Sequence, residues 1–166
     1  SEAAVYAWVA MREAMADAGL EPDAVSDPRI GVIAAAGGSS SARITEGADA
    51  LRSGGLRRLS PFTAARTMGS NVSACLATSF QIQGLSYSIV SACSSGAHSI
   101  GAAMEQVQLG KQDIVFAGAS EEENWILASH FDAMGALSTR SNETPERASR
   151  PYDRGRDGFV MSAGAG

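Results

Sequence analysis

Cys93 is the residue of this sequence whose type and surroundings favour nucleophilic chemistry. It follows the apolar, β-branched run Tyr87–Ala92 and precedes a short stretch of small residues at 94–96. A thiol at the amino end of a helix faces unpaired N–H groups and the positive end of the helix dipole, and both favour the thiolate. The same N–H groups can hold an oxyanion that forms on an attacked carbonyl. The pattern suits acyl transfer through a covalent thioester, although a lone cysteine is more often a small buried hydrophobe.

The elements around Cys93 predict one βαβ unit. The runs Tyr87–Ala92 and Asp113–Gly118 are typical of buried strands. Between them, apolar and small residues recur at helical spacing over 97–109, and Gly110 follows as a helix stop. Strand, helix and strand within about thirty residues indicate a right-handed crossover and a parallel sheet. Cys93 lies where the first strand meets the helix.

The rest of the chain continues this alternation of helices and strands. Residue patterns predict helices at 3–18, 45–59, 61–68, 72–80 and from a capping box at Ser120 to Phe131, and strands at 29–36 and from 158 onward. The loop Gly37–Ser41 follows the strand at 29–36. In open α/β sheets this carboxyl end of the strands is where ligands bind.

Composition limits the classes of function. The chain has 166 residues, of which 45% are hydrophobic, and a net charge of −5 with no basic stripe, which argues against a nucleic-acid partner. No apolar run reaches membrane-spanning length, so no membrane insertion is expected. The two cysteines have no metal or redox spacing, which predicts no metal site and free thiols in a reducing, cytoplasmic compartment. Cys75 lies among small apolar residues and is expected to pack in the core without chemistry.

Three stretches carry a resemblance to a known family: SACSSGAHSIGAAMEQVQLGKQDIVFAG, FDAMGALSTR and RPYDRGRDGFVMSAGAG. They resemble β-ketoacyl-[acyl carrier protein] synthases over essentially the whole chain, and most of all the type I enzymes of bacterial fatty-acid synthesis. The resemblance implies an α/β, thiolase-like layered fold built from two similar halves. It also implies that residues 1–166 are an incomplete N-terminal half with a mixed, mainly parallel sheet, lacking its opening strand and the whole C-terminal half.

The resemblance assigns roles to individual residues. Cys93 matches the family nucleophile, and Phe131 matches a residue that lines the acyl pocket. Gly37 matches a glycine at the floor of that pocket. Met68 matches a residue that approaches the partner's pocket in the family's dimers. The resemblance therefore predicts one catalytic residue and three substrate-binding residues in this chain.

The two histidines of the chain, His98 and His130, are not expected to be catalytic. Neither occurs in a family catalytic motif, and the family takes its two catalytic histidines and a lysine from the second half. His98 lies five residues beyond Cys93, more than one helical turn away and on another side of the helix. The sequence gives no reason to place either side chain within hydrogen-bond reach of a reacting proton.

The implied reaction is the decarboxylating Claisen condensation of acyl-carrier protein with malonyl-carrier protein in fatty-acid chain elongation. No cofactor is expected beyond the phosphopantetheine that the carrier brings, because the thioester supplies the activation. The chain alone is expected to be inactive. Two alternatives remain open: a noncatalytic partner subunit of a polyketide synthase, against which Cys93 counts, and a thioester hydrolase, against which the GFVMSAGAG ending counts.

Two partners are implied. The acyl carrier protein is acidic, so Arg57 and Arg58 are candidates for its docking patch, although a short run of arginines is usually only a solvated face. In the family a homodimer forms through the strand that precedes the nucleophile, here Tyr87–Ala92. An unpaired apolar edge strand would otherwise be an aggregation hazard.

Overall fold

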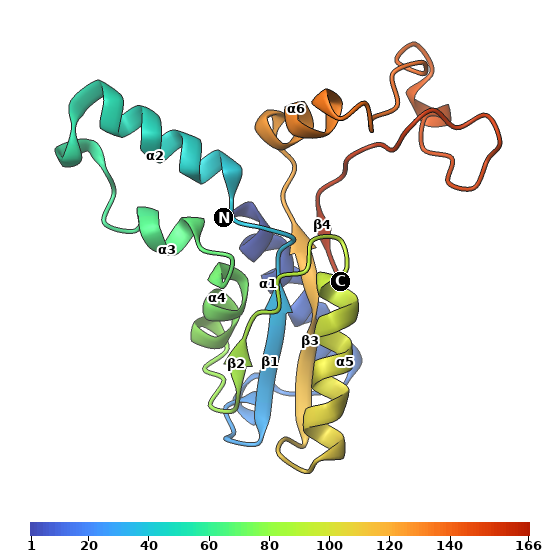
Figure 1. Ribbon diagram of the computed structural model, residues 1–166. Coiled ribbons are helices and arrows are strands. Elements are labelled where there is room, and N and C mark those ends of the chain that lie inside the picture. Colours follow the sequence, from blue (N-terminus) through green and yellow to red (C-terminus); the bar gives the residue numbers. More distant parts are fainter. The chain divides into compact units, whose positions relative to one another are not determined.

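The computed structural model describes all residues from Ser1 to Gly166 and divides them into two compact units (Figure 1). The first unit comprises residues 1–122 and 164–166, and the second comprises 123–163. The first unit contains α1 (Glu2–Asp17), η1 (Pro22–Val25), β1 (Ile30–Ala35), α2 (Ser41–Gly54), η2 (Leu56–Arg58), α3 (Thr63–Thr67), α4 (Asn71–Ser79), β2 (Ser86–Tyr87), α5 (Ser95–Gln108), β3 (Ile114–Glu121) and β4 (Gly164–Ala165), where η marks a 3₁₀ helix. The second contains α6 (Trp125–Ala133) and η3 (Pro145–Arg147).

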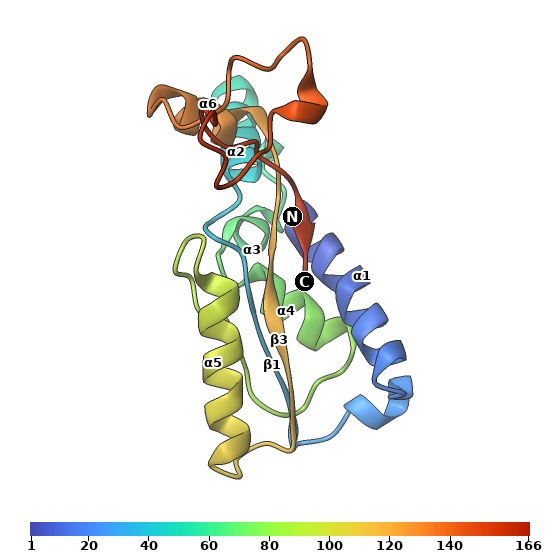
Figure 2. The same cartoon turned by 90° about the vertical axis from the view of Figure 1, so that its right-hand side faces the viewer.

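The first unit is built on a four-stranded sheet with the order β2-β1-β3-β4. β1 is parallel to both β2 and β3, and β4 is antiparallel to β3. The predicted α/β fold with a mixed, mainly parallel sheet is therefore confirmed. Seen edge-on, α5 covers one face of the sheet, while α1 and α4 cover the other (Figure 2). All six residues of β1 are buried because helices cover both of its faces.

The core of the first unit lies between β1 and the helices α1 and α4. On α1 the buried side chains recur every four residues, so they form one stripe that faces the sheet. The stripe packs on alternate residues of β1 and on two apolar side chains of α4. The contributing residues are Ala3, Ala7, Met11, Met15, Val32, Ala34, Val72 and Leu76. None of the helices is both long and apolar enough to cross a bilayer.

The expected strand at Tyr87–Ala92 is wrong over most of its length. The ladder of β2 stops at Tyr87. Beyond it, the Ser88 hydroxyl donates to the carbonyl of Ala34 over 2.6 Å, so a side chain replaces the ladder hydrogen bond. Ala92 has a φ of +51°, which a strand residue does not adopt. The small polar side chains in this segment end the strand early.

The expected helix start at Ser120 is also wrong. β3 continues to Glu121 because Ser120 and Glu121 pair with β4, a contact between segments distant in sequence. The helix α6 begins only at Trp125, where the Asn124 side chain accepts hydrogen bonds from the N–H groups of Ile126 and Leu127. The three glutamates at 121–123 are therefore not the first turn of a helix.

Two further boundaries differ from the expectation. The helix expected at 45–59 begins at Ser41 and ends at Gly54, where Gly55 adopts a φ of +66° that favours glycine. The strand expected from 158 onward is reduced to one bridge between Leu137 and Phe159, and the ladder strand is β4. The helices expected at 3–18, 61–68 and 72–80 are confirmed to within a few residues.

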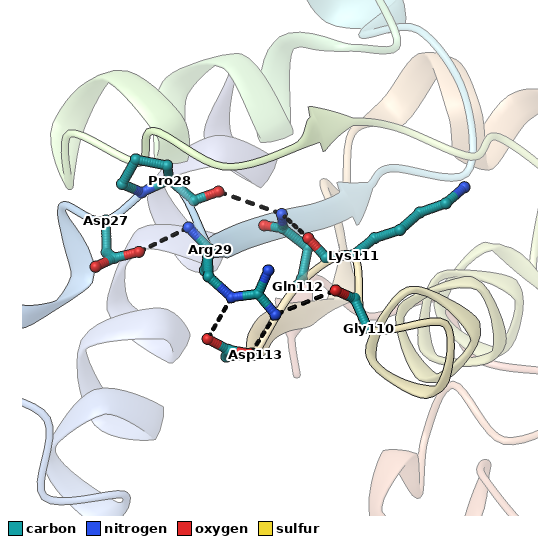
Figure 3. Close-up of polar contacts among 7 residues, drawn as sticks. All are labelled: Asp27, Pro28, Arg29, Gly110, Lys111, Gln112 and Asp113. Carbon is teal, nitrogen blue, oxygen red and sulfur yellow. Dashed lines mark hydrogen bonds and ion pairs between the residues drawn. The ribbon is translucent and has the colours of Figure 1, made fainter.

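At the amino ends of β1 and β3, Arg29 ties the two strands together (Figure 3). Its guanidinium donates to both carboxylate oxygens of Asp113, over 2.6 and 2.5 Å, and to the carbonyl of Gly110 over 3.1 Å. The hydrogen bond with Arg29 lowers the pKa of Asp113. The buried Gln112 side chain adds hydrogen bonds to the carbonyls of Pro28 and Lys111. This polar cluster fixes the end of the sheet opposite to Cys93.

The second unit is organised around the carboxylate of Asp157. This carboxylate accepts hydrogen bonds from the N–H of Arg140 (2.9 Å), the hydroxyl of Ser138 (2.8 Å) and the N–H of Thr139 (3.0 Å). These bonds, that from Arg140 first, lower the pKa of Asp157 from 3.8 to about 2. All three donors favour the ionised form, so the charge stabilises the loop that follows α6.

Stability should therefore depend on the ionisation of Asp157. Because its pKa is lower in the folded state, the carboxylate stabilises the fold above about pH 4, and this contribution is lost as the pH falls toward about 2. We expect the free energy of unfolding of the wild-type protein to fall more steeply across that window than that of Asp157→Asn. Denaturant titrations at several pH values measure both slopes. A parallel fall in the two proteins would contradict the role of Asp157.

Candidate active site

Cys93 is exposed and lies two residues before the first residue of α5. The segment that leads to it from β2 ends in a tight turn, in which the N–H of Ser94 donates to the carbonyl of Ser91 over 3.1 Å. Ala92 and Cys93 are the two central residues of this turn. The structure thus places Cys93 at the amino end of a helix, on an exposed turn at the carboxyl end of the parallel strands, where the sequence predicted it.

Buried Ser95 holds this turn from inside. Its hydroxyl donates to the carbonyl of Ala92 over 2.7 Å and accepts from the N–H of Ser91 over 2.9 Å. Its own N–H also donates to the Ala92 carbonyl, over 3.1 Å. Below the turn, α5 packs closely on β3, because a Cβ on Gly96 would lie 3.4 Å from the Cβ of Ala119. The turn is therefore anchored both locally and to the sheet.

Gly37 meets the turn of Cys93 at the same end of the sheet. It follows β1, and a Cβ built on it would lie 2.5 Å from the Glu121 carboxylate and 3.5 Å from the Ala92 carbonyl oxygen. Its N–H donates to the Glu121 carboxylate over 2.9 Å. The fold thus brings Gly37 next to Ala92, the residue before Cys93, and Glu121 lies beside Gly37.

A second carboxylate secures the loop that contains Gly37. The hydroxyl of Ser40 donates to both carboxylate oxygens of Glu122, over 2.7 and 2.9 Å, and both residues are buried. The same hydroxyl accepts from the N–H of Arg43 and so caps α2. The end of β3 therefore holds the loop after β1 at two points. Met68, 53% exposed at the end of α3, lines a narrow cleft with this loop and the two glutamates.

The remaining candidates are two arginines of the first unit and one phenylalanine of the second. Arg57 and Arg58 are exposed in η2 and form no ion pair, and Arg58 lines a cleft of about 170 Å³ with Arg43 and Arg66. Phe131 belongs to the second unit, where its ring packs edge-on against Phe159 with centroids 5.1 Å apart.

No hydrogen bond links His98 to Cys93 within the first unit, and His130 belongs to the second unit. His98 is exposed on α5, and His130 is exposed on α6 in the second unit. Neither side chain makes a hydrogen bond with another residue, whereas a catalytic histidine is normally oriented by a second group. The expectation that they have no catalytic role remains a prediction.

Sequence reasoning missed the positions of Ser95, Glu121 and Glu122. The available signal was three consecutive glutamates directly after a buried run, at the edge of a parallel sheet where functional groups gather. Those glutamates were assigned to a helix start instead. Ser95 carried no signal of its own, because a serine in a small polar stretch is equally typical of any loop.

Comparisons with known proteins identify the family of the chain. The family model described as "Beta-ketoacyl synthase, N-terminal domain" matches residues 1–166. The chain is 56% identical over its whole length to 3-oxoacyl-[acyl-carrier-protein] synthase 1 of Escherichia coli K12, and spans 41% of that protein.

Solved structures show the same fold. A β-ketoacyl synthase from Burkholderia phymatum has a TM-score of 0.89 and 32% identity, covering 99% of this chain and 40% of its own. A type II polyketide synthase ketosynthase, solved in complex with its acyl-carrier protein, has a TM-score of 0.86 and 30% identity over 96% of this chain and 41% of its own. The thiolase-like fold follows from these neighbours, and the chain belongs to the N-terminal domain family of the β-ketoacyl synthases.

Proposed function

We propose that residues 1–166 are the N-terminal part of a condensing enzyme that joins acyl-carrier protein to malonyl-carrier protein with loss of carbon dioxide, in fatty-acid chain elongation. The observation that carries the proposal is the exposed Cys93 on its turn at the start of α5. The 56% identity to a relative named 3-oxoacyl-[acyl-carrier-protein] synthase supports the substrate class. This chain covers less than half of that relative, so the second part of the enzyme lies outside it.

The first half-reaction is acyl transfer to Cys93. The thiolate attacks the thioester carbonyl, a bond from sulfur to carbon forms, and the carrier's phosphopantetheine leaves as a thiol after taking up a proton. The oxyanion of the tetrahedral intermediate needs N–H donors close to the nucleophile. The N–H groups of Cys93, Gly96 and Ala97 make no backbone hydrogen bond in the chain, so they are available at this end of α5.

The second half-reaction is carbon–carbon bond formation. Loss of carbon dioxide from malonyl-carrier protein gives an enolate, whose carbon attacks the acyl group on Cys93 and releases the thiol. Stabilising that enolate needs positioned donors, which the family takes from histidines in the second half. We propose, from the resemblance alone, substrate-binding roles for Gly37, Phe131 and the partner's copy of Met68. No step requires a metal or redox cofactor.

The direct test is an assay of the complete protein with acyl- and malonyl-carrier proteins. Equal amounts of carbon dioxide and ketoacyl product are expected. Release of free fatty acid without carbon–carbon bond formation would indicate the thioester hydrolase. Absence of acyl transfer in a folded protein would indicate the noncatalytic subunit. No observation favours either alternative. The exposed Cys93 counts against the noncatalytic subunit, and the match to the β-ketoacyl synthase family counts against the hydrolase.

Reversing the charge of Arg57 and Arg58 to glutamate should weaken carrier-protein substrates and spare small thioester mimics. Both side chains are exposed and unpaired, as a docking surface for an acidic protein requires. Charges at the rim of an interface act mainly on the encounter rate, so we expect kcat/KM for the carrier substrate to fall by about tenfold at low salt. The difference in kcat/KM between wild type and variant should shrink as the salt concentration is raised. A matched control is Arg52→Glu, whose wild-type guanidinium is already paired with Asp49. Equal losses of kcat/KM with carrier-protein substrates and with small thioester mimics would show that the two arginines do not dock the carrier.

We also propose that the complete protein is a homodimer that pairs at the β2 edge. β2 is the edge strand of the sheet, and Val90 beyond it is 49% exposed. A free edge of this kind favours pairing with another strand. Light scattering of the complete protein should give twice the mass of one chain, and Val90→Glu should shift it toward the monomer. An active wild-type monomer would contradict the proposal.

A further inference from the structure

Ala92, immediately before Cys93, has a backbone conformation that alanine does not favour. Its φ is +51°, and only Gln81 and Tyr152 among the other non-glycine residues have a positive φ. In the left-handed region the alanine Cβ crowds the following carbonyl, so the chain prefers other conformations unless neighbouring groups compensate. Something in the fold therefore holds Ala92 in this state.

The group that holds it is Ser95. The Ala92 carbonyl accepts two hydrogen bonds, and both come from Ser95, one from its hydroxyl at 2.7 Å and one from its N–H at 3.1 Å. The same hydroxyl accepts from the N–H of Ser91 at 2.9 Å. Ser95 is 2% exposed, so water does not compete freely for these bonds. One hydroxyl thus closes both sides of the turn that contains Cys93.

We propose that Ser95 is a positioning residue for Cys93. Its hydroxyl keeps Ala92 left-handed and thereby holds the thiol on the turn at the start of α5. Without it the turn relaxes toward ordinary backbone angles, and Cys93 spends less time in the reactive position. The catalytic benefit of this positioning rests on the proposed function. The effect of Ser95 on the reactivity of the Cys93 thiol does not depend on it.

The test measures the rate of Cys93 alkylation by iodoacetamide in the complete protein, followed by peptide mapping. Ser95→Ala removes both hydrogen bonds of the hydroxyl and should slow the reaction by about tenfold. Ser95→Thr keeps a hydroxyl on Cβ and should restore most of the rate. The matched control is Ser99→Ala, one turn along α5, because the Ser99 hydroxyl is equally buried and has no hydrogen-bond partner.

Repeating the substitution in an Ala92→Gly protein separates a positioning role of Ser95 from a general loosening of the fold. Glycine adopts a positive φ without the steric cost that alanine bears. In an Ala92→Gly protein, Ser95→Ala should therefore slow alkylation by less than about threefold, since the strain that Ser95 opposes is gone. The same tenfold loss in both backgrounds, or failure of Ser95→Thr to restore the rate, would overturn the inference.

Acyl transfer gives an independent readout. Ser95→Ala should lower the rate of acylation at saturating carrier protein and leave the carrier's KM unchanged, because docking is proposed to use Arg57 and Arg58. If wild-type Cys93 is alkylated quickly but never acylated, the proposed function fails while the positioning role stands. If Ser95→Ala is alkylated as fast as wild type, the positioning role fails while the function stands.

Discussion

Replacing Cys93 with alanine in the complete protein should abolish both acyl transfer and condensation. The reason is that the covalent thioester has no other atom on which to form, and removal of a nucleophile typically costs on the order of 10³-fold or more in rate. Because Cys93 is exposed and its side chain fills no core position, the variant should fold as stably as wild type. Steady-state rates together with thermal unfolding separate loss of chemistry from loss of structure.

The matched control for this prediction is Cys75→Ala. Cys75 is half-buried on α4 and accepts a weak hydrogen bond from the Asn71 side chain at 3.5 Å. Its removal should alter stability slightly and leave the rate of condensation close to wild type. The assignment of the chemistry to Cys93 would be wrong if Cys93→Ala still formed ketoacyl product. It would also be wrong if a folded Cys75→Ala protein formed none.

The 166-residue chain on its own should not catalyse condensation. Loss of one acid–base group usually costs on the order of 10²–10⁴ in rate, and on the proposed function the two histidines used in decarboxylation come from the part of the enzyme outside this chain. His98 and His130 are exposed and make no orienting hydrogen bond, so we do not expect them to take over this role. The chain also leaves apolar side chains of α5 exposed, which favours aggregation: Ile100, Met104 and Val107.

The measurement is carbon dioxide release and ketoacyl product from the purified chain, with the complete protein as control. We expect neither product above background from the chain alone. Turnover close to that of the complete protein would show that the residues of the 166-residue chain suffice for condensation. His98 and His130 would then be the first residues to mutate.

The sequence predicted the parts of this fold that depend on local patterns. The buried stripe of α1 recurs every four residues, and β1 is a short run of apolar residues, so both were found close to their true bounds. The corner at Cys93 was found for the same reason, since a small polar stretch stood between an apolar run and a helical pattern.

The parts that were missed depend on contacts between distant segments. β3 continues through Ser120 because β4 pairs with it, and that partner lies more than forty residues later in the chain. β2 ends at Tyr87 because the Ser88 hydroxyl bonds the carbonyl of Ala34 on β1. The place of Glu121 beside Gly37 also follows from the alignment of two strands and not from any local spacing.

Cys93 should be the residue that carries the acyl group, and peptide mapping of the acylated protein locates that group. The complete protein is incubated with acyl-carrier protein and no malonyl substrate, then quenched, digested and analysed by mass spectrometry. We expect one acyl group per chain, on the peptide that contains Cys93, and none on the peptide that contains Cys75. Acyl groups on Cys75 or on any other residue, with Cys93 free in a protein competent for condensation, would contradict it.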